Sequence, residues 1–111
     1  MYNLVYLIGR LVSDPELKKS ENSKEHVLVT IAVQRSFKNP DGIYDTDFIK
    51  CSLWNGIAKN VSEYCKKGDL IGIRGRLQVR NYEDNGEVKY ITEVIAEKIS
   101  FLTSKKQENE Q

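Results

Sequence analysis

The chain has 111 residues and a formal net charge of +1, from 17 Lys and Arg residues against 16 Asp and Glu residues. This length suits one domain with its own hydrophobic core and is too short for two domains of ordinary size. With 40% hydrophobic and 30% charged residues, the composition excludes a fibrous or fully disordered chain, and no apolar run reaches the length of a transmembrane helix.

Alternating apolar residues and regular turn signals predict strands in the N-terminal half of the chain. We expect these strands at residues 2–12, 26–35 and 44–54. The Asn-Pro-Asp-Gly sequence at residues 39–42 suits a type I turn between the second and third of them. The first segment has neither a basic leader nor a small-residue cleavage site, so we expect a cytoplasmic protein without membrane attachment.

In the C-terminal half, the spacing of apolar residues changes from every second residue to that of a helix. Apolar residues at helical spacing predict a helix over residues 56–67. Two further strands are expected at residues 70–82 and 88–101, and the Asn-Gly pair at residues 85–86 is a strong hairpin signal between them.

Three strands, a helix and two strands form the element order of an OB-fold, a five-stranded Greek-key barrel with its helix between strands three and four. We therefore predict an all-β OB-fold domain over residues 1–103, followed by a short polar disordered tail over residues 104–111. An SH3-like barrel is the main alternative, but it does not need a helix of three turns at this position.

The third predicted strand carries aromatic residues on the face away from the core. Alternate apolar residues from Ile49 to Leu53 predict the core face, because successive side chains of a strand point to opposite sides. The outward face then carries Phe48, Lys50 and Trp54.

The fourth predicted strand has the same arrangement. Its apolar residues Ile71, Ile73, Leu77 and Val79 share one face. Its outward face carries Arg74, Arg76, Arg80 and Tyr82. The end of the second strand adds Arg35 and Phe37.

Interleaved rings and cations on adjacent strands predict binding to single-stranded nucleic acid, which offers a charged backbone and flat base faces. Because every base has a π-face, the expected binding is independent of sequence. Two alternatives remain open, an RNA-binding OB module and a protein-interaction module whose aromatic face contacts a partner protein. Cross-strand aromatic pairs and arginines on a solvated face would produce part of the same pattern.

The sequence predicts no enzyme activity, metal site or cofactor. His26 has no recognisable nucleophile as a partner for catalysis. The three aspartates within residues 41–47 do not match the spacing of a calcium loop and are interpreted as turn formers. Cys51 and Cys65 lack zinc-ligand spacing and are interpreted as reduced, buried thiols.

Over residues 1–102 the chain resembles the single-stranded DNA-binding protein family of bacteria and phages, in a short form without an acidic C-terminal tip. The resemblance rests on four segments in chain order: NLVYLIGRLVSDPEL, TIAVQRSF, DFIKCSLWNGIAKNVSEYCKKGDLIGIRGRLQVRNYEDNG and YITEVIAEKI. Agreement in one order over this length is far more specific than a short motif.

The resemblance assigns roles to particular side chains. In that family, bases stack on aromatic residues after strand two, on strand three and at the start of the last hairpin. The corresponding residues, which the sequence pattern also selects, are Phe37, Phe48, Trp54 and Tyr82. The residues expected to contact the DNA backbone are Arg35, Lys50, Arg74, Arg76 and Arg80.

The resemblance also implies a homotetramer that wraps DNA around its outside, with subunit contacts through Asn3, Val5 and Leu7 of the first strand. The implied function is to coat and protect single-stranded DNA during replication, recombination, repair or DNA uptake. Family members that recruit replication and repair enzymes have a long tail with an acidic, hydrophobic tip, so we expect no such recruitment by this chain. A short paralogue for DNA uptake and recombination, a phage protein and a shortened chain remain open.

Overall fold

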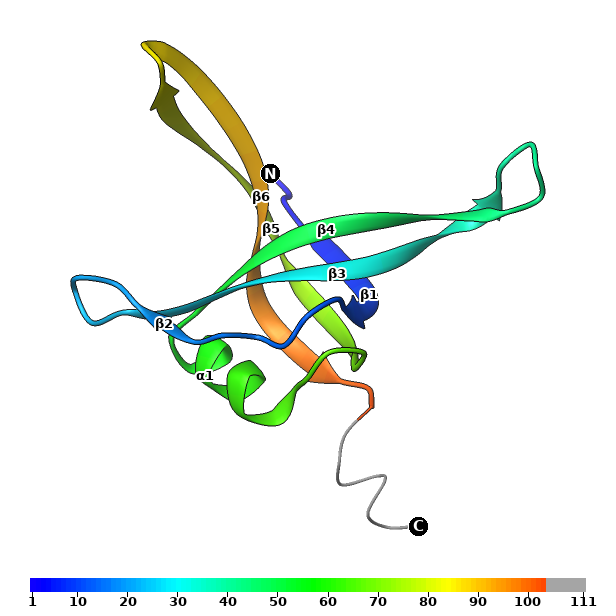
Figure 1. Cartoon of the computed structure of the whole chain (residues 1–111), viewed down its shortest axis with the longest axis horizontal. Helices are drawn as coiled ribbons and strands as arrows, with labels where there is room; N and C mark the ends of the chain where they lie inside the picture. Colours follow the sequence, from blue (N-terminus) through cyan, green and yellow to red (C-terminus); the bar gives the residue numbers. More distant parts are fainter. Residues whose placement is uncertain (104–111) are drawn as a thin grey trace.

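The computed structural model describes residues 1–103, so the predicted tail at residues 104–111 lies outside the described residues. Six strands and one helix make up the described part (Figure 1). In chain order they are β1 (Val5–Leu11), β2 (Lys18–Lys19), β3 (Glu25–Lys38), β4 (Tyr44–Trp54), α1 (Asn55–Tyr64), β5 (Leu70–Asp84) and β6 (Glu87–Phe101).

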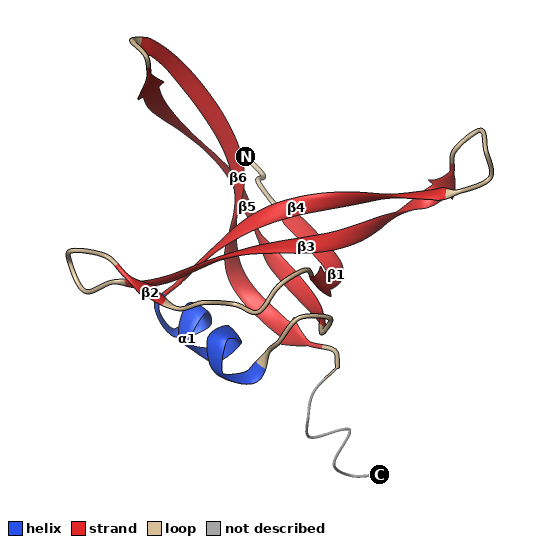
Figure 2. Cartoon of the chain, in the orientation of Figure 1, coloured by secondary structure: helices blue, strands red, loops and turns tan. Residues whose placement is uncertain are grey.

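Five of the strands close into a barrel. The sheet runs in the order β1-β5-β6-β4-β3, and a second pairing of β1 with β3 joins its two edges. The β4–β6 pairing is parallel and is confined to Cys51↔Val94 and Ser52↔Ile95, whereas the other pairings are antiparallel. With α1 between β4 and β5 (Figure 2), this arrangement confirms the predicted OB-fold.

The core fills the barrel and continues beneath α1. Alternate residues of the strands point inward, as the period-two pattern predicts. The helix closes one end of the barrel with Ala58 and Val61, both fully buried. The buried residues are Leu11, Val27, Val29, Ile31, Cys51, Leu53, Ala58, Val61, Ile71, Ile73, Val94 and Ala96.

The helix is shorter than predicted. It ends at Tyr64 rather than at residue 67, because Cys65 already has extended backbone angles and its N–H closes the last turn onto the Val61 carbonyl. The next residues form a separate turn, in which the Asp69 carboxylate accepts a hydrogen bond of 3.0 Å from the Lys66 N–H. The positive φ of Gly68, 93°, belongs to this turn and not to the helix end.

Strand β2 was not predicted. Lys18 and Lys19 lie in a segment without apolar alternation, and they pair with His26 and Glu25 at the start of β3. This pairing holds β2 against the first residues of β3.

Two hairpins extend beyond the barrel (Figure 1). We call them the β3–β4 arm, residues 35–46, and the β5–β6 arm, residues 79–91. The second arm turns at Asn85 and Gly86, whose φ values of 52° and 83° confirm the hairpin turn that the Asn-Gly pair predicts. Both strands of each arm are longer than the barrel requires, so their outer parts are largely exposed.

A bulge changes which residues of β6 face the core. Arg74 pairs with Lys98 but Gly75 pairs with Ala96, so Glu97 is an extra residue in β6. Val94 and Ala96 are therefore buried on one side of the bulge, and Ile99 packs against the core on the other. Gly75 has no room for a side chain at this point, because a Cβ atom would lie 2.9 Å from the carbonyl carbon of Ile95 and nearer still to its oxygen.

Candidate nucleic-acid interface

Strand pairing builds one continuous outer face across β3, β4, β6 and β5. Directly opposed residues of paired strands share a face. The β3–β4 ladder contributes the outward pairs His26↔Trp54, Leu28↔Ser52, Thr30↔Lys50 and Ala32↔Phe48. The parallel contact Ser52↔Ile95 continues this face onto β6, and the pairs Arg76↔Ile95 and Gln78↔Glu93 continue it onto β5.

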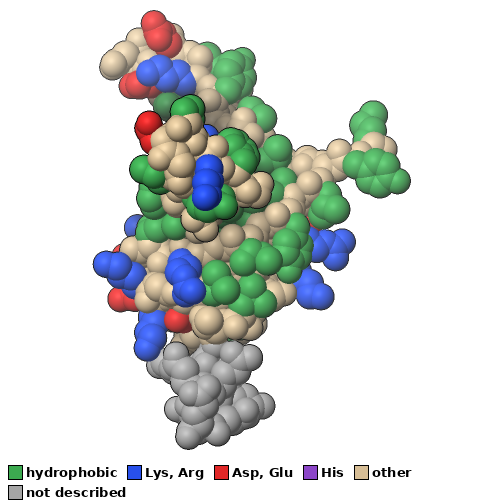
Figure 3. Space-filling model, turned by 90° about the vertical axis from the view of Figure 1, so that its right-hand side faces the viewer, with side chains coloured by type: hydrophobic (Ala, Val, Ile, Leu, Met, Phe, Trp, Pro, Cys, Tyr) green, Lys and Arg blue, Asp and Glu red, His purple; other side chains and the backbone are tan. Residues whose placement is uncertain are grey.

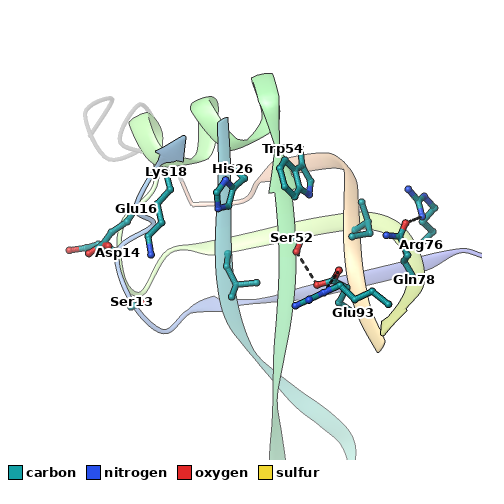
Figure 4. A pocket seen from close by; sticks show the side chains of 13 residues that line it. Ser13, Asp14, Glu16, Lys18, His26, Ser52, Trp54, Arg76, Gln78 and Glu93 are labelled. Carbon is teal, nitrogen blue, oxygen red and sulfur yellow. Dashed lines mark hydrogen bonds and ion pairs between the residues drawn. The ribbon is translucent and has the colours of Figure 1, made fainter. Parts of the chain in front are cut away.

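A groove of about 1050 Å³ lies on this face. Figure 4 shows His26 and Trp54 side by side on neighbouring strands, with Glu93, Gln78 and Arg76 farther across the groove. On the flank formed by β2 and the segment before it, the groove is lined by Asp14, Glu16 and Lys18. The groove thus combines a ring pair, cations and the carboxylates of Asp14, Glu16 and Glu93.

The four predicted stacking residues are all exposed, but the groove contains only one of them. Trp54 is 40% exposed and its ring lies 5.0 Å from the ring of His26, with 30° between the two planes. Phe48 lies on the same outer face of β4, and 67% of it is exposed. Phe37 and Tyr82 lie on the two separate arms.

Hydrophobic and basic side chains also mix on the face of the molecule that carries the β3–β4 arm. Seen from the side of the β3–β4 arm, hydrophobic side chains are spread over the exposed surface, and Lys and Arg side chains lie between them (Figure 3). A surface of this kind offers both stacking platforms and positive charge to a single strand.

Three of the five predicted backbone contacts are already paired with carboxylates. Arg80 Nε lies 3.3 Å from Glu93 Oε1, and Arg76 Nε lies 3.6 Å from Glu97 Oε2. The third paired arginine is Arg35, described below. The structure gives no ion pair, among residues 1–103, for Lys50 or Arg74. A phosphate that binds Arg76 or Arg80 therefore has to replace or join a carboxylate.

Arg35 forms an ion pair that includes two hydrogen bonds to the same carboxylate. Its Nε and Nη2 both donate to the Asp47 carboxylate at 3.0 Å, and its Nη1 lies 3.7 Å from Asp45 Oδ2. The side-chain hydrogen bond raises the pKa of Arg35 and lowers the pKa of Asp47 below its ordinary value. A carboxyl with a lowered pKa stabilises the fold above its ordinary pKa, and this contribution is lost as the pH falls through the lowered value.

His26 and Glu93 also line the groove, although neither was predicted from the sequence as a site residue. The alternation of residues 26–35 puts His26 on the outward face, but its contact with Trp54 depends on the strand register, which the sequence pattern does not provide. Glu93 lies on the outward face of β6 and binds Ser52 through a hydrogen bond of 3.2 Å. In the sequence, a single acidic residue on the outward face of a strand does not indicate a binding site.

The two cysteines take no part in the groove. Cys51 is buried in the core, and burial raises its pKa to about 12. Burial also raises the pKa of Cys65 to about 11. Both thiols are therefore protonated near neutral pH and are poor nucleophiles. Within residues 1–103 no group of three or more His, Cys, Asp or Glu side chains is arranged to hold a metal ion, and no helix there is long and apolar enough to cross a membrane.

The residues predicted for subunit contacts lie on or just before β1. The Asn3 side chain donates to the Leu77 carbonyl and accepts from the Leu77 N–H, each at 2.8 Å, so it extends the β1–β5 pairing. Val5 and Leu7 are half-buried and pack against the chain's own core. The outward residues of this strand are Tyr6 and Ile8, which are 56% and 49% exposed.

A closed OB barrel whose outer face carries rings and cations defines a class of nucleic-acid-binding domain. The family model described as the single-strand binding protein family matches residues 2–102. The chain belongs to this family, which confirms the resemblance found in the sequence.

The chain is similar over nearly its whole length to named relatives. It is 43% identical over 109 residues to single-stranded DNA-binding protein B of Bacillus subtilis (strain 168), covering 97% of this chain and 96% of the relative. It is 47% identical to single-stranded DNA-binding protein 3 of Listeria innocua, covering 95% of this chain and 66% of the relative. It is 48% identical to a single-stranded DNA-binding protein of Bacillus cereus, covering 92% of this chain and 61% of the relative.

Proposed function

We propose that this protein binds single-stranded DNA independently of sequence, and that it coats and protects the strand during replication, recombination, repair or DNA uptake. The observation that carries the proposal is the groove, which brings the Trp54 ring and the guanidinium groups of Arg76 and Arg80 together on one outer face. The names of its relatives and its family support the same function. Coating of this kind needs no cofactor and no catalysis, and it takes place in the cytoplasm, where the protein associates with the nucleoid through the DNA.

In this proposal, the bases stack on exposed rings while cations neutralise the phosphates. The stacking residues are Phe37, Phe48, Trp54 and Tyr82. The backbone contacts are Arg35, Lys50, Arg74, Arg76 and Arg80. The strand enters at the groove, follows the outer face of β4 past Phe48, and is held farther out by the two arms. Residues 1–103 form the binding domain.

The proposed assembly is a homotetramer that wraps DNA around its outside, with Asn3, Val5 and Leu7 at the subunit contacts. The apolar side chains of β1 support it, because Tyr6 and Ile8 leave large apolar surface in water when the chain is alone. The mass of the particle in solution, measured by light scattering, tests this assembly. A mass of four chains is expected, and a mass of one chain contradicts it.

The dependence of affinity on salt tests the proposed function. Each phosphate contact on a single strand contributes about −0.7 to the slope of log affinity against log salt. Four contacts per protomer then give a slope of roughly −3 for oligo-dT. Arg80→Gln should make the slope shallower by about 0.7 if Arg80 contacts one phosphate.

Lys59→Gln is the matched control, because Lys59 is an exposed cation on α1, away from the groove. It should leave the slope unchanged. An affinity indifferent to salt would exclude the cationic face as the binding site. Equal or tighter binding of a matched RNA oligomer would favour an RNA-binding module, and no binding of any nucleic acid would favour a protein-interaction module.

A further inference from the structure

Glu93, one of the acidic residues that line the groove, is not explained by phosphate binding. Glu93 lies between two groups of the outer face: its Oε2 accepts a hydrogen bond of 3.2 Å from Ser52 Oγ, and its Oε1 lies 3.3 Å from Arg80 Nε. Only 13% of its side chain is exposed, against 55% for Arg80. The ion pair with Arg80 and the hydrogen bond from Ser52 hold this largely buried carboxylate in place beside the groove.

Glu93 still has unused acceptor capacity. A carboxylate has about four lone-pair sites, and the contacts with Ser52 and Arg80 occupy one on each oxygen. Glu93 also lines the groove, so its remaining exposed surface faces that space. Ser52, which holds it, lies two residues along β4 from Trp54, a separation of about 7 Å. Trp54 and Glu93 line the same groove, so a base stacked on the ring shares that space with the carboxylate.

Gln78 supplies a complementary donor beside this acceptor. It is the direct cross-strand partner of Glu93, and it too lines the groove. Its side-chain oxygen accepts a hydrogen bond of 2.6 Å from Arg76 Nη1, which leaves its amide NH₂ group as a donor. Cytosine has an amino donor next to ring acceptors, whereas thymine has a carbonyl oxygen where cytosine has the amino group.

We infer that Glu93 is a specificity-determining residue, whose carboxylate accepts a hydrogen bond from the amino group of a cytosine stacked at Trp54 and discriminates against thymine at this position. The inference rests on the proposed function. It predicts that one place in an otherwise sequence-tolerant site reads the base edge.

Glu97 provides the comparison needed to test this inference. Like Glu93, it is a glutamate of β6 that pairs with an arginine of β5, at 3.6 Å from Arg76 Nε. Its side chain is 52% exposed and does not line the groove. Glu93→Gln and Glu97→Gln both remove one negative charge beside an arginine, so both should raise general affinity for DNA. Only the first replaces a carboxylate oxygen that lines the groove with an NH₂ donor, which suits the carbonyl oxygen of thymine better than the amino group of cytosine.

The experiment measures the dissociation constants of oligo-dC and oligo-dT of equal length, at equal salt and mildly alkaline pH, for the wild-type protein and both variants. The quantity compared is the ratio of the two constants, since the homopolymers differ in their own stacking. Glu93→Gln should shift this ratio toward oligo-dT by roughly tenfold, and Glu97→Gln should leave it unchanged.

A second arm uses the wild-type protein alone, so the test does not depend on the folding of a variant. Oligo-dC is compared with the same oligomer built from pyrimidin-2-one, which lacks the amino group and adds no bulk. A weaker affinity for the second oligomer, by a similar factor, supports the inference. An unchanged ratio in Glu93→Gln and equal affinities in the second arm overturn it and leave Glu93 as a partner of Arg80 only. Absence of binding to every oligomer would instead refute the proposed function.

Discussion

Trp54→Ala is expected to weaken the binding of oligo-dT by about 1 to 3 kcal/mol, the contribution of one base stacked on an aromatic ring. The ring lies outside the core, where it contacts His26 and lines the groove. Because a cross-strand pair contributes only about 0.2 to 1 kcal/mol to folding, the loss of stability should be smaller than the loss of affinity. Titration and thermal unfolding of the same preparation separate the two effects.

Tyr64→Ala is the matched control for this variant. Tyr64 is an exposed ring on α1 with an edge-on contact to Phe101 at 6.4 Å, and it does not line the groove. Its removal should leave affinity for oligo-dT unchanged. If Trp54→Ala lost stability and affinity in equal measure, Trp54 would be a structural residue and not a stacking platform.

Gly75→Ala should cause the largest loss of stability. A Cβ atom at this position meets the backbone of Ile95 in the neighbouring strand, and backbone atoms of a paired strand cannot move aside as a flexible side chain can. Overpacking costs typically 1 to 3 kcal/mol and sometimes more, and we expect about 3 kcal/mol or more here. For a domain of this size that lowers the thermal midpoint by roughly 12 to 24 °C.

Gly56→Ala provides the opposite outcome with the same chemical change. Gly56 lies in α1, and a Cβ atom there has no heavy atom within 4 Å. Because Ala is favoured over Gly within a helix by roughly 0.5 to 1 kcal/mol, this variant should be as stable as the wild type or slightly more stable. A Gly75→Ala protein with an unchanged thermal midpoint would show that the Ile95 backbone leaves room for a side chain at position 75.

The fold was largely predictable because its elements depend on local patterns. The alternation that ends at Leu53 identified the core face of β4, and the Asn-Gly pair identified the β5–β6 turn. The predicted C-terminal end of α1 was wrong. Asp69, which lies outside the helix, accepts a hydrogen bond from the Lys66 N–H and favours a separate turn. The bulge at Glu97 left no sequence signal, because it depends on how β6 pairs with β5.

The candidate site was predictable as a set of exposed residues but not as an arrangement. Alternation placed Trp54 and Arg80 outward, and both line the groove. Their neighbours depend on strand register, which no single strand specifies. The stacking of His26 on Trp54 and the pairing of Arg35 with Asp47 therefore emerged only from the structure.

Bases that stack on the outward aromatic ring of the groove should change the fluorescence of Trp54. Trp54 is the only tryptophan of the chain, so the signal reports this one position. Titration with oligo-dT should quench the fluorescence strongly, and added salt should reverse the quenching. Unchanged fluorescence in a folded protein, with oligo-dT in excess, would contradict base stacking on Trp54.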